Sequence, residues 1–502
     1  MPAAETTGPG SEGTSLRGES PETLLLFGVP FHNLTFDEAL AGIAARARSR
    51  RLSQIVTSNL DFIFQAWKDP EMHRIHLDAD LVFADGWPPV TFSRLFGPRL
   101  KERVAGSDLV PHLASVARDH GLSIFALGGR PGVAQEAMRI LAERFPGLRI
   151  AGCESPPLLP LQEMDHAALC RRISDAKPDI LLVAFGAPKQ DKWIRMNQSR
   201  IGVPVALGVG GSLDFIAGTQ HRAPKWIQKI GMEWFWRLAS QPKRLFRRYS
   251  SNLAFLMMML ARLLWIRLTP AGIGAGVPIP DGPGGASGIR AMAVLKPLRS
   301  APEAVRFCAE HEIRAREGLT VLDLNGFGWL NSLELGALAR LARAAGEGGR
   351  PLLLASVSAR VRRLLRLFRL DRFVEIATSP EAWIRRRDEL VGPPSVRAAQ
   401  WENDSDLVRI VLPELLEGEG AWSLASEFLD RARGRDVLRV VVDGRRLRYI
   451  DSSGVHFLRT VRRHLDSKPG AALTLRSFPS SALEILRQEG LGSIPVDPGA
   501  SE

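Results

Sequence analysis

The stretch LDADLVFADGWPPVTFSRLFGPRLKERVAGSD, residues 77–108, indicates how the first half of the chain folds. Its apolar run Leu81–Ala84 predicts a buried strand that stops at Asp85. In open parallel α/β sheets ligands bind outside the carboxyl ends of the strands, so an acid at this position is well placed to act on a ligand. Further along, Arg103 offers a cation beside the same edge, as acid–base chemistry next to a phosphate requires. The alternative is that Asp85 caps the next helix or belongs to a plain turn.

Short apolar runs alternate with amphipathic segments as far as Val209 and predict a doubly wound, mainly parallel, Rossmann-like α/β sheet. The expected strands are Leu24–Val29, Gln54–Thr57, Leu81–Ala84, Ser123–Leu127, Leu148–Ala151, Ile180–Phe185 and Val203–Val209, and the expected helices are Phe36–Arg48, Asp108–His120, Val133–Arg144 and Met164–Ala176. Three strand ends lead into Gly-rich loops, whose backbone N–H groups can hold a phosphate. None is a Walker A or GxGxxG motif, so each loop taken alone is also compatible with a tight turn.

Composition sets the broad class of the protein. A chain of 502 residues is too long for one core and suggests about three domains. The cysteines, Cys153, Cys170 and Cys308, are scattered, which argues against a disulfide framework or a zinc site and favours a reducing, cytoplasmic compartment. No secretory signal opens the chain, and residues 1–21 are expected to be a disordered leader.

The net charge of +12 is concentrated in two basic regions, residues 222–267 and 360–387. Such regions suit anionic lipid, a sugar nucleotide or nucleic acid. The chain has no zinc finger and no RNA-binding aromatic signature, so nucleic acid is not the expected partner. Steep salt-dependent DNA affinity would be the sign of that third option.

Residues 222–249 interleave Trp with Arg, and Leu253–Leu268 is then nearly all apolar. A membrane-spanning helix needs about 20 apolar residues, and Arg in its interior is costly. Because Arg262 and Arg267 interrupt the run, residues 251–268 are predicted to be an amphipathic helix lying at a membrane surface. The alternative is a core helix with one solvated face.

Residues 269–290 are rich in Gly and Pro and are expected to be a linker. An internal repeat follows, in which Asp323 and Ser332 recur 120 residues later as Asp443 and Ser452. In each copy a helix, a strand and a second helix are expected, the strands being Pro351–Ala355 and Ala472–Leu475 and the second helices Val361–Leu367 and Ala482–Gln488. The repeat predicts two small α/β domains, residues 291–390 and 400–495.

Several motifs in order resemble the WecG/TagA/CpsF family of bacterial glycosyltransferases over residues 24–249, within a domain placed at 22–250. They are Thr57-x-Asn59, Ala84-Asp85-Gly86, Arg103-Val104-Ala105-Gly106, Gly128-Gly129-x-Pro131-Gly132, Gly186-Ala187-Pro188-Lys189-Gln190, Gly208-Val209-Gly210-Gly211 and Arg222-Ala223-Pro224. The resemblance implies inverting transfer of a sugar, N-acetylmannosamine or a related hexose, from a UDP-sugar to a lipid-pyrophosphate-linked acceptor. It places the enzyme at the inner face of the cytoplasmic membrane, in cell-surface or exopolysaccharide biosynthesis.

Carried over by position, the resemblance makes Asp85 the general base, with Thr57 and Asn59 beside it in the pocket. It implies substrate contacts from Arg103, Gln190, Gly128, Gly129, Gly186, Gly210, Gly211, Arg222, Arg237 and Arg244. No cofactor and no metal are expected, because the family is not thought to need the metal-binding Asp-x-Asp motif. Asp78-Ala79-Asp80 is therefore interpreted as a helix-to-strand junction.

The second repeat carries Asp451-Ser452-Ser453-Gly454 and resembles STAS domains, known from anti-sigma-factor antagonists. The resemblance implies that a partner kinase phosphorylates Ser452; the alternative is that Ser452 caps a helix. The first repeat has Asn331 before Ser332 and is interpreted as a degenerate STAS-like domain. The leading hypothesis is a transferase with STAS-like modules for regulation or docking to a protein partner. The alternative is a STAS-based switch with an inactive transferase domain, and a homo-oligomer stays open in either case.

Overall fold

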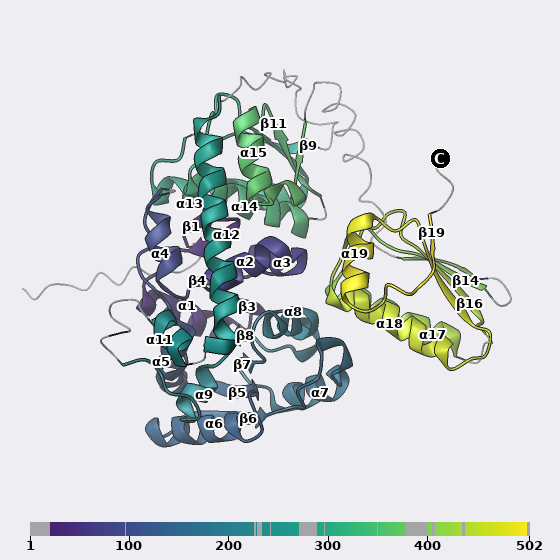
Figure 1. Ribbon diagram of the computed structural model, residues 1–502, viewed down its shortest axis with the longest axis horizontal. Helices are drawn as coiled ribbons and strands as arrows, with labels where there is room; N and C mark the ends of the chain where they lie inside the picture. The colour runs from purple at the N-terminus through teal and green to yellow at the C-terminus, as the bar shows by residue number, and fades with distance from the viewer. Residues whose placement is uncertain are drawn as a thin grey trace, which may run out of the picture.

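The computed structural model describes residues 21–95, 97–224, 227, 233–240, 242–270, 289–295, 297–348, 350–377, 399–403, 407–433 and 437–498. Figure 1 shows a larger body that holds the N-terminal domain and the first repeat, with the second repeat beside it as a separate domain. The expected leader, 1–21, and linker, 269–290, lie mostly outside the described residues.

The N-terminal domain is built on a six-stranded sheet in which every neighbouring pair is parallel. Its strand order is β4-β3-β8-β7-β5-β6, with β3 Ser53–Ser58, β4 Leu81–Ala84, β5 Ser123–Gly128, β6 Arg149–Glu154, β7 Ile180–Ala184 and β8 Val205–Gly208. Helices cover both faces, so the predicted α/β fold class is confirmed. Parallel strands buried on both faces read as continuous apolar runs, which is why the sequence marked them well.

The four predicted helices are present as α1 Phe36–Ser49, α5 Gly106–Asp119, α6 Val133–Arg144 and α7 His166–Ala176. A capping box holds the start of α1, where Thr35 and Glu38 accept each other's backbone N–H. The sequence did not predict α2 Leu60–Lys68, α3 Pro70–Asp78, α4 Trp87–Ser93, α8 Lys189–Ile201 and α9 Ser212–Ile216. Two of these, α3 and α8, face the second repeat (Figure 1).

The predicted single strand Leu24–Val29 is wrong. The segment is a hairpin in which β1 Thr23–Leu26 pairs antiparallel with β2 Val29–His32. Phe27 and Gly28 form the turn with φ of 51° and 88°, the positive values that two-residue hairpin turns favour. Both strands are almost entirely buried, so apolar residues run through the turn and hide it from the pattern.

A long helix, α12 Pro242–Leu268, follows the short α11 Glu233–Ser240 and extends along the larger body (Figure 1). Its inner face buries Phe255, Leu256, Met259, Leu263 and Ile266 against the core. The predicted helix 251–268 is therefore present, but it begins at Pro242.

The two repeats share one topology. The first has the parallel order β12-β11-β10-β9, and the second has β13-β14-β16-β18-β19 with only β13 antiparallel to its neighbour. The first contains β9 Ile289–Val294, α13 Ala301–Glu317, β10 Leu319–Asp323, α14 Ser332–Glu347, β11 Leu352–Ala355, α15 Ala359–Leu367 and β12 Val374–Ile376. The second contains β13 Gln400–Asn403, β14 Leu407–Val411, β15 Leu415–Leu416, α17 Gly418–Ala432, β16 Arg439–Asp443, β17 Tyr449–Ile450, α18 Ser452–Asp466, β18 Ala472–Arg476, α19 Ser480–Gln488 and β19 Val496–Asp497. The internal repeat is confirmed.

The first repeat shares its hydrophobic core with the N-terminal domain. One continuous cluster joins Leu24 and Leu25 of β1, Met259 of α12 and Leu338 and Leu341 of α14. Helix α14 lies so close to β1 that a Cβ added at Gly336 would stand 2.1 Å from the carbonyl oxygen of Thr23. The core cluster of the second repeat, in contrast, contains only residues between Val408 and Ile494.

Candidate active site

The carboxyl edge of the sheet brings together side chains that are distant in sequence. Thr57 is the second-last residue of β3, and Asp85 follows β4, where its N–H donates to the carbonyl oxygen of Ser58 at 2.9 Å. Gly106, the first residue of α5, lies close to Thr57 and Ser212. A Cβ at Gly106 would be 3.3 Å from Thr57 Oγ1 and 3.7 Å from Ser212 Oγ. Ser212 was not singled out from the sequence, although it follows the Gly210-Gly211 motif directly.

Asp85 and Asn59 hold different positions at this edge. Gly86, with φ of 111°, occupies the N-cap of α4, so Asp85 is not the capping residue of that helix. Asn59 does cap a helix, because its Oδ1 accepts the N–H groups of Asp61 at 3.0 Å and Phe62 at 3.3 Å. A structural role thus accounts for Asn59, while Asp85 stands half-buried at the strand end.

The glycine loops lie at the same edge as Asp85. Gly128, Gly129, Gly186 and Gly210 all have φ between 50° and 108°, a region that other residues adopt only with strain. Gly128 also passes so close to β7 that a Cβ there would meet the carbonyl carbon of Ala184 at 2.8 Å. Gly211 lies in the N-cap position of α9.

Gln190 connects two of these loops. Its side-chain Oε1 accepts the N–H of Gly186 at 3.1 Å and the N–H of Gly210 at 3.0 Å, and the residue is only 2% exposed. Beside it, Asp191 is fully buried, and burial raises the pKa of its carboxyl to about 7. This geometry makes Gln190 a positioning residue that fixes the two loops relative to each other.

Two predicted basic residues meet near the start of α5. Arg103 lies 3.1 Å from Asp108 and 3.7 Å from Glu233 of α11, and Arg222 lies 2.5 Å from Asp108 and 3.5 Å from the same glutamate. Burial alone would raise the pKa of Asp108, but the hydrogen bond and charge of Arg222 outweigh it and lower that pKa. The side chains of Arg237 and Arg244 lie outside the described residues.

The Asp-x-Asp sequence stands at the opposite edge of the sheet, before β4. Asp78 pairs with Arg74 at 2.8 Å and with Arg195 at 2.9 Å, and Asp80 accepts the N–H of Gln54 at 3.2 Å. These carboxylates are therefore structural partners at a helix-to-strand junction, as expected. Among the described residues no group of three or more His, Cys, Asp or Glu side chains is arranged to hold a metal ion.

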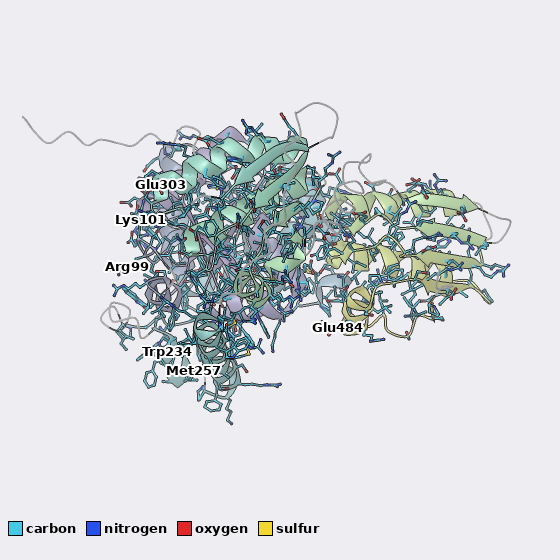
Figure 2. All side chains as sticks on the ribbon, turned by 90° about the horizontal axis from the view of Figure 1, so that it is seen from above. Arg99, Lys101, Trp234, Met257, Glu303 and Glu484 are labelled. Carbon is cyan, nitrogen blue, oxygen red and sulfur yellow. The ribbon has the colours of Figure 1, made fainter. Side chains whose placement is uncertain are left out.

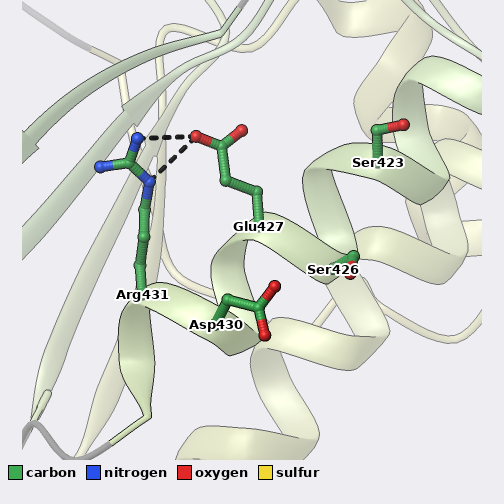
Figure 3. Close-up of a pocket in the computed structure, with 5 residues that line it drawn as sticks. All are labelled: Ser423, Ser426, Glu427, Asp430 and Arg431. Atoms are coloured by element: carbon green, nitrogen blue, oxygen red, sulfur yellow. Dashed lines mark hydrogen bonds and ion pairs between the residues drawn. The ribbon is translucent and has the colours of Figure 1, made fainter.

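Figure 3 shows a hollow on the surface of α17, which belongs to the second repeat and not to the six-stranded sheet. Its lining residues, Ser423, Ser426, Glu427, Asp430 and Arg431, all come from that one helix. Glu427 and Arg431 pair at 2.7 Å, one helical turn apart. The hollow contains none of the glycine loops of the carboxyl edge.

Comparison with known proteins indicates the family of the N-terminal domain. The model of the glycosyl transferase WecG/TagA/CpsF family matches residues 24–268. The N-acetylglucosaminyldiphosphoundecaprenol N-acetyl-beta-D-mannosaminyltransferase of Bacillus subtilis (strain 168) is 28% identical over 224 residues, which are 44% of this chain and 86% of that enzyme. The enzyme of the same name from Bacillus spizizenii is 30% identical over 221 residues, 43% of this chain and 84% of that enzyme. Its counterpart in Staphylococcus aureus (strain MW2) is 28% identical over 224 residues, with 44% and 86% covered.

A solved structure of the anti-sigma factor antagonist SpoIIAA in its unphosphorylated form is similar to one part of the chain. It is 21% identical, covers 20% of this chain and 90% of that one, and superposes with a TM-score of 0.20.

The motifs at the strand ends, the side chains at the carboxyl edge and the relatives all indicate the same family. The match to the Bacillus spizizenii enzyme covers most of that enzyme, as does the match to the Bacillus subtilis one. The chain belongs to the WecG/TagA/CpsF family of glycosyl transferases.

Proposed function

We propose that this glycosyltransferase moves N-acetylmannosamine or a related hexose from a UDP-sugar to a lipid-diphosphate-linked acceptor, inverting the anomeric centre. The relatives are named for transfer of N-acetyl-beta-D-mannosamine to N-acetylglucosaminyldiphosphoundecaprenol, a lipid-linked acceptor. The observation that carries the proposal is the position of Thr57, Asp85 and the glycine loops at the carboxyl edge of one sheet, together with Arg103 and Arg222, which both pair with Asp108 of α5.

In the proposed reaction, the acceptor hydroxyl attacks the anomeric carbon of the donor as the bond to the UDP oxygen breaks. The hydroxyl proton passes to the carboxylate of Asp85, which acts as the general base. One attack from the face opposite the leaving group inverts the anomeric centre. Thr57, 6% exposed and in contact with Gly106, would fix the wall of the pocket next to that carboxylate.

Negative charge develops on the leaving UDP, and fixed cations stabilise it. Arg103 and Arg222 are suited to that task because guanidinium groups bind phosphate oxygens in pairs. In the described structure Asp108 and Glu233 hold both guanidinium groups in place. Glu233 belongs to α11, outside the sheet. A bound diphosphate would compete with the Glu233 carboxylate for the guanidinium groups of Arg103 and Arg222.

The direct test is UDP release by the purified full chain with a panel of UDP-sugars and a short-chain lipid-diphosphate N-acetylglucosamine acceptor. Release that depends on the acceptor and persists in EDTA would support a metal-independent transferase and identify its donor. No release from any donor would favour the alternative, a STAS-based switch with an inactive transferase domain.

Gln190→Leu is expected to lower kcat/KM for the donor by about 10-fold. The leucine fills the space of the glutamine but leaves the buried N–H groups of Gly186 and Gly210 without their acceptor, which costs about 1–3 kcal/mol for each buried donor. Steady-state kinetics of UDP release measure the effect, with Gln135→Leu on the exposed face of α6 as the control. Unchanged kcat/KM would mean that the two loops keep their positions without Gln190.

We also propose that the enzyme lies on the inner face of the cytoplasmic membrane. The α11–α12 region carries an apolar patch, defined here as Trp234, Phe235, Phe246, Leu253, Met257, Leu264 and Leu268, each between 43% and 76% exposed. Trp234 and Met257 project from the same side of the molecule (Figure 2). The segment Leu245–Leu268 is long and apolar enough to cross a membrane, but a third of it is buried in the protein. Helix α12 thus has one apolar face in the core and one outside, as an interfacial anchor would.

Replacing Leu253, Met257 and Leu264 together by Ser is expected to reduce binding to anionic vesicles by about 10-fold or more. Each exposed side chain would otherwise bury apolar area in the lipid, at about 25 cal/mol per Å². Vesicle co-sedimentation measures the effect. The matched control replaces Leu95, Leu158 and Ile313 by Ser, since these side chains are equally exposed elsewhere. Equal loss in both triple variants would remove the patch as the anchor.

A further inference from the structure

The second repeat, residues 399–498, rests on the transferase domain through α17 and α18, which both contact α8, and the start of α18 also contacts α3 (Figure 1). Trp422 of α17 anchors this contact. Its Nε1 donates to the carbonyl oxygen of Met196 in α8 at 2.8 Å, and the guanidinium of Arg200 lies 4.1 Å from the centre of its ring. The ring of His456, in α18 of the same repeat, packs against the Trp422 ring with the two ring centres 4.4 Å apart. An indole that is both packed and hydrogen-bonded is typical of the centre of a specific interface.

Ser452, the first residue of α18, directs all its polar groups to the transferase domain. Its N–H donates to Glu71 Oε1 at 3.1 Å and its hydroxyl donates to Glu71 Oε2 at 2.7 Å. Its carbonyl oxygen accepts the side-chain N–H of Gln162 at 3.1 Å. Ser452 is 3% exposed and Glu71 6%, so this contact, termed here the Ser452–Glu71 latch, is closed to solvent.

Several ion pairs surround the latch. Lys192 lies 2.9 Å from Glu71, and Glu417 of the second repeat lies 3.7 Å from Arg74 and 3.6 Å from Arg195. Behind Ser452, Asp451 caps α18, and burial, with the nearby charge of Glu71, raises the pKa of its carboxyl to about 7. Lys192 also pairs with Asp69, and Arg74 and Arg195 also pair with Asp78, so these cations are already engaged by acidic side chains.

The latch requires an uncharged side chain at position 452. A negatively charged group there would remove the hydroxyl proton that Glu71 accepts and would place like charges at hydrogen-bond distance. Away from water such repulsion is screened weakly, and a buried unpaired charge is strongly unfavourable. The docked arrangement and a negative charge at 452 therefore exclude each other.

Docking also reaches the candidate active site through α8. The second repeat holds the middle and end of this helix, because Glu417 pairs with Arg195 and Trp422 contacts Met196 and Arg200. The same helix begins with Lys189 and Gln190, and Gln190 fixes the Gly186 and Gly210 loops. A rigid helix held along its body keeps its first turn in place.

We propose that the second repeat is a regulatory domain of the chain. The Ser452–Glu71 latch holds it on α3 and α8, and negative charge at position 452 releases it. Release frees α8 and lowers transfer. The effect on turnover rests on the proposed function, whereas the charge-controlled docking does not.

The test compares Ser452→Glu with Ser452→Ala in the full chain. We expect Ser452→Glu to increase the radius of gyration measured by X-ray scattering and to speed amide exchange in α3 and α8 by at least about 10-fold. Ser452→Ala, which adds no charge, should stay docked. The matched control is Ser426→Glu, which adds the same charge at the exposed hollow of α17 (Figure 3). Wild-type scattering and exchange in Ser452→Glu would overturn the proposal.

A second variant tests whether repulsion is the cause. Adding Glu71→Gln to Ser452→Glu removes the like charge and places an amide N–H donor opposite the new carboxylate, so docking should return. Failure to return would overturn the charge mechanism. UDP release then tests the regulatory half: we expect Ser452→Glu to lower kcat/KM about threefold or more. Unchanged turnover in a released chain would overturn that half. An inactive wild type would contradict the proposed function without touching the docking result.

Discussion

Asp85→Asn is expected to lower kcat for sugar transfer by about 100-fold or more, the effect that removal of a general base has in other enzymes. The amide is the same size as the carboxylate but cannot accept the proton of the attacking hydroxyl. The backbone N–H of Asp85, which donates to Ser58, is unchanged, so the strand end should keep its structure. Single-turnover UDP release and a thermal unfolding curve of the same sample measure the two effects separately.

Asp175→Asn is the matched control, because Asp175 is an exposed carboxylate in α7, away from the carboxyl-edge cluster. It should leave both activity and stability as in the wild type. A normal kcat in Asp85→Asn would rule out this carboxylate as the base. A loss of activity together with a lowered melting temperature would instead assign Asp85 a structural role.

Ending the chain at Thr269 is expected to abolish soluble protein, whereas ending it at Ala377 should leave a folded enzyme. The first truncation removes α14 and α15 and uncovers the core they share with β1 and α12. The second removes only the domain that has a core of its own. Soluble yield and the cooperativity of thermal unfolding distinguish the two truncations.

A point substitution in the full chain tests the same contact between α14 and β1 that the first truncation removes. Gly336→Val should destabilise the protein by about 3 kcal/mol, because its Cβ would stand 2.1 Å from the carbonyl oxygen of Thr23 and would push α14 off β1. Gly420→Val, also in a helix, meets nothing within 4 Å and should have little effect. A soluble, cooperatively folding chain that ends at Thr269 would show that the first repeat is dispensable.

The fold of the N-terminal domain could be read from the sequence largely because its strands are buried on both faces. Leu81–Ala84 appears in the structure with the predicted bounds. Helix α8 was missed because its buried face includes Gln190, Asp191 and Asn197, which break the apolar period. The hairpin of β1 and β2 was missed for the opposite reason, since nothing polar marks its turn.

The candidate site was predictable to the extent that it is made of strand ends. Thr57 lies near the end of β3, Asp85 follows β4 and Gly106 begins a helix, and parallel topology brings the strand ends to one edge. The pairing of Glu233 with Arg103 and Arg222 depends on where α11 packs, which no local pattern encodes. Nor does any pattern connect Ser452 with Glu71, 381 residues away in the chain.

The Ser452–Glu71 latch joins two parts of one chain that are separated in sequence by residues 378–398. Because both parts belong to one chain, each meets the other at an effective concentration of about 1 mM, whatever the concentration of the protein. A free protein that competed for the start of α18 would have to overcome that local concentration, and most cellular proteins are far more dilute. A negative charge on Ser452 does not have to outcompete that local concentration, because it repels Glu71 within the contact itself. The latch is therefore better suited to covalent control than to control by a competing ligand.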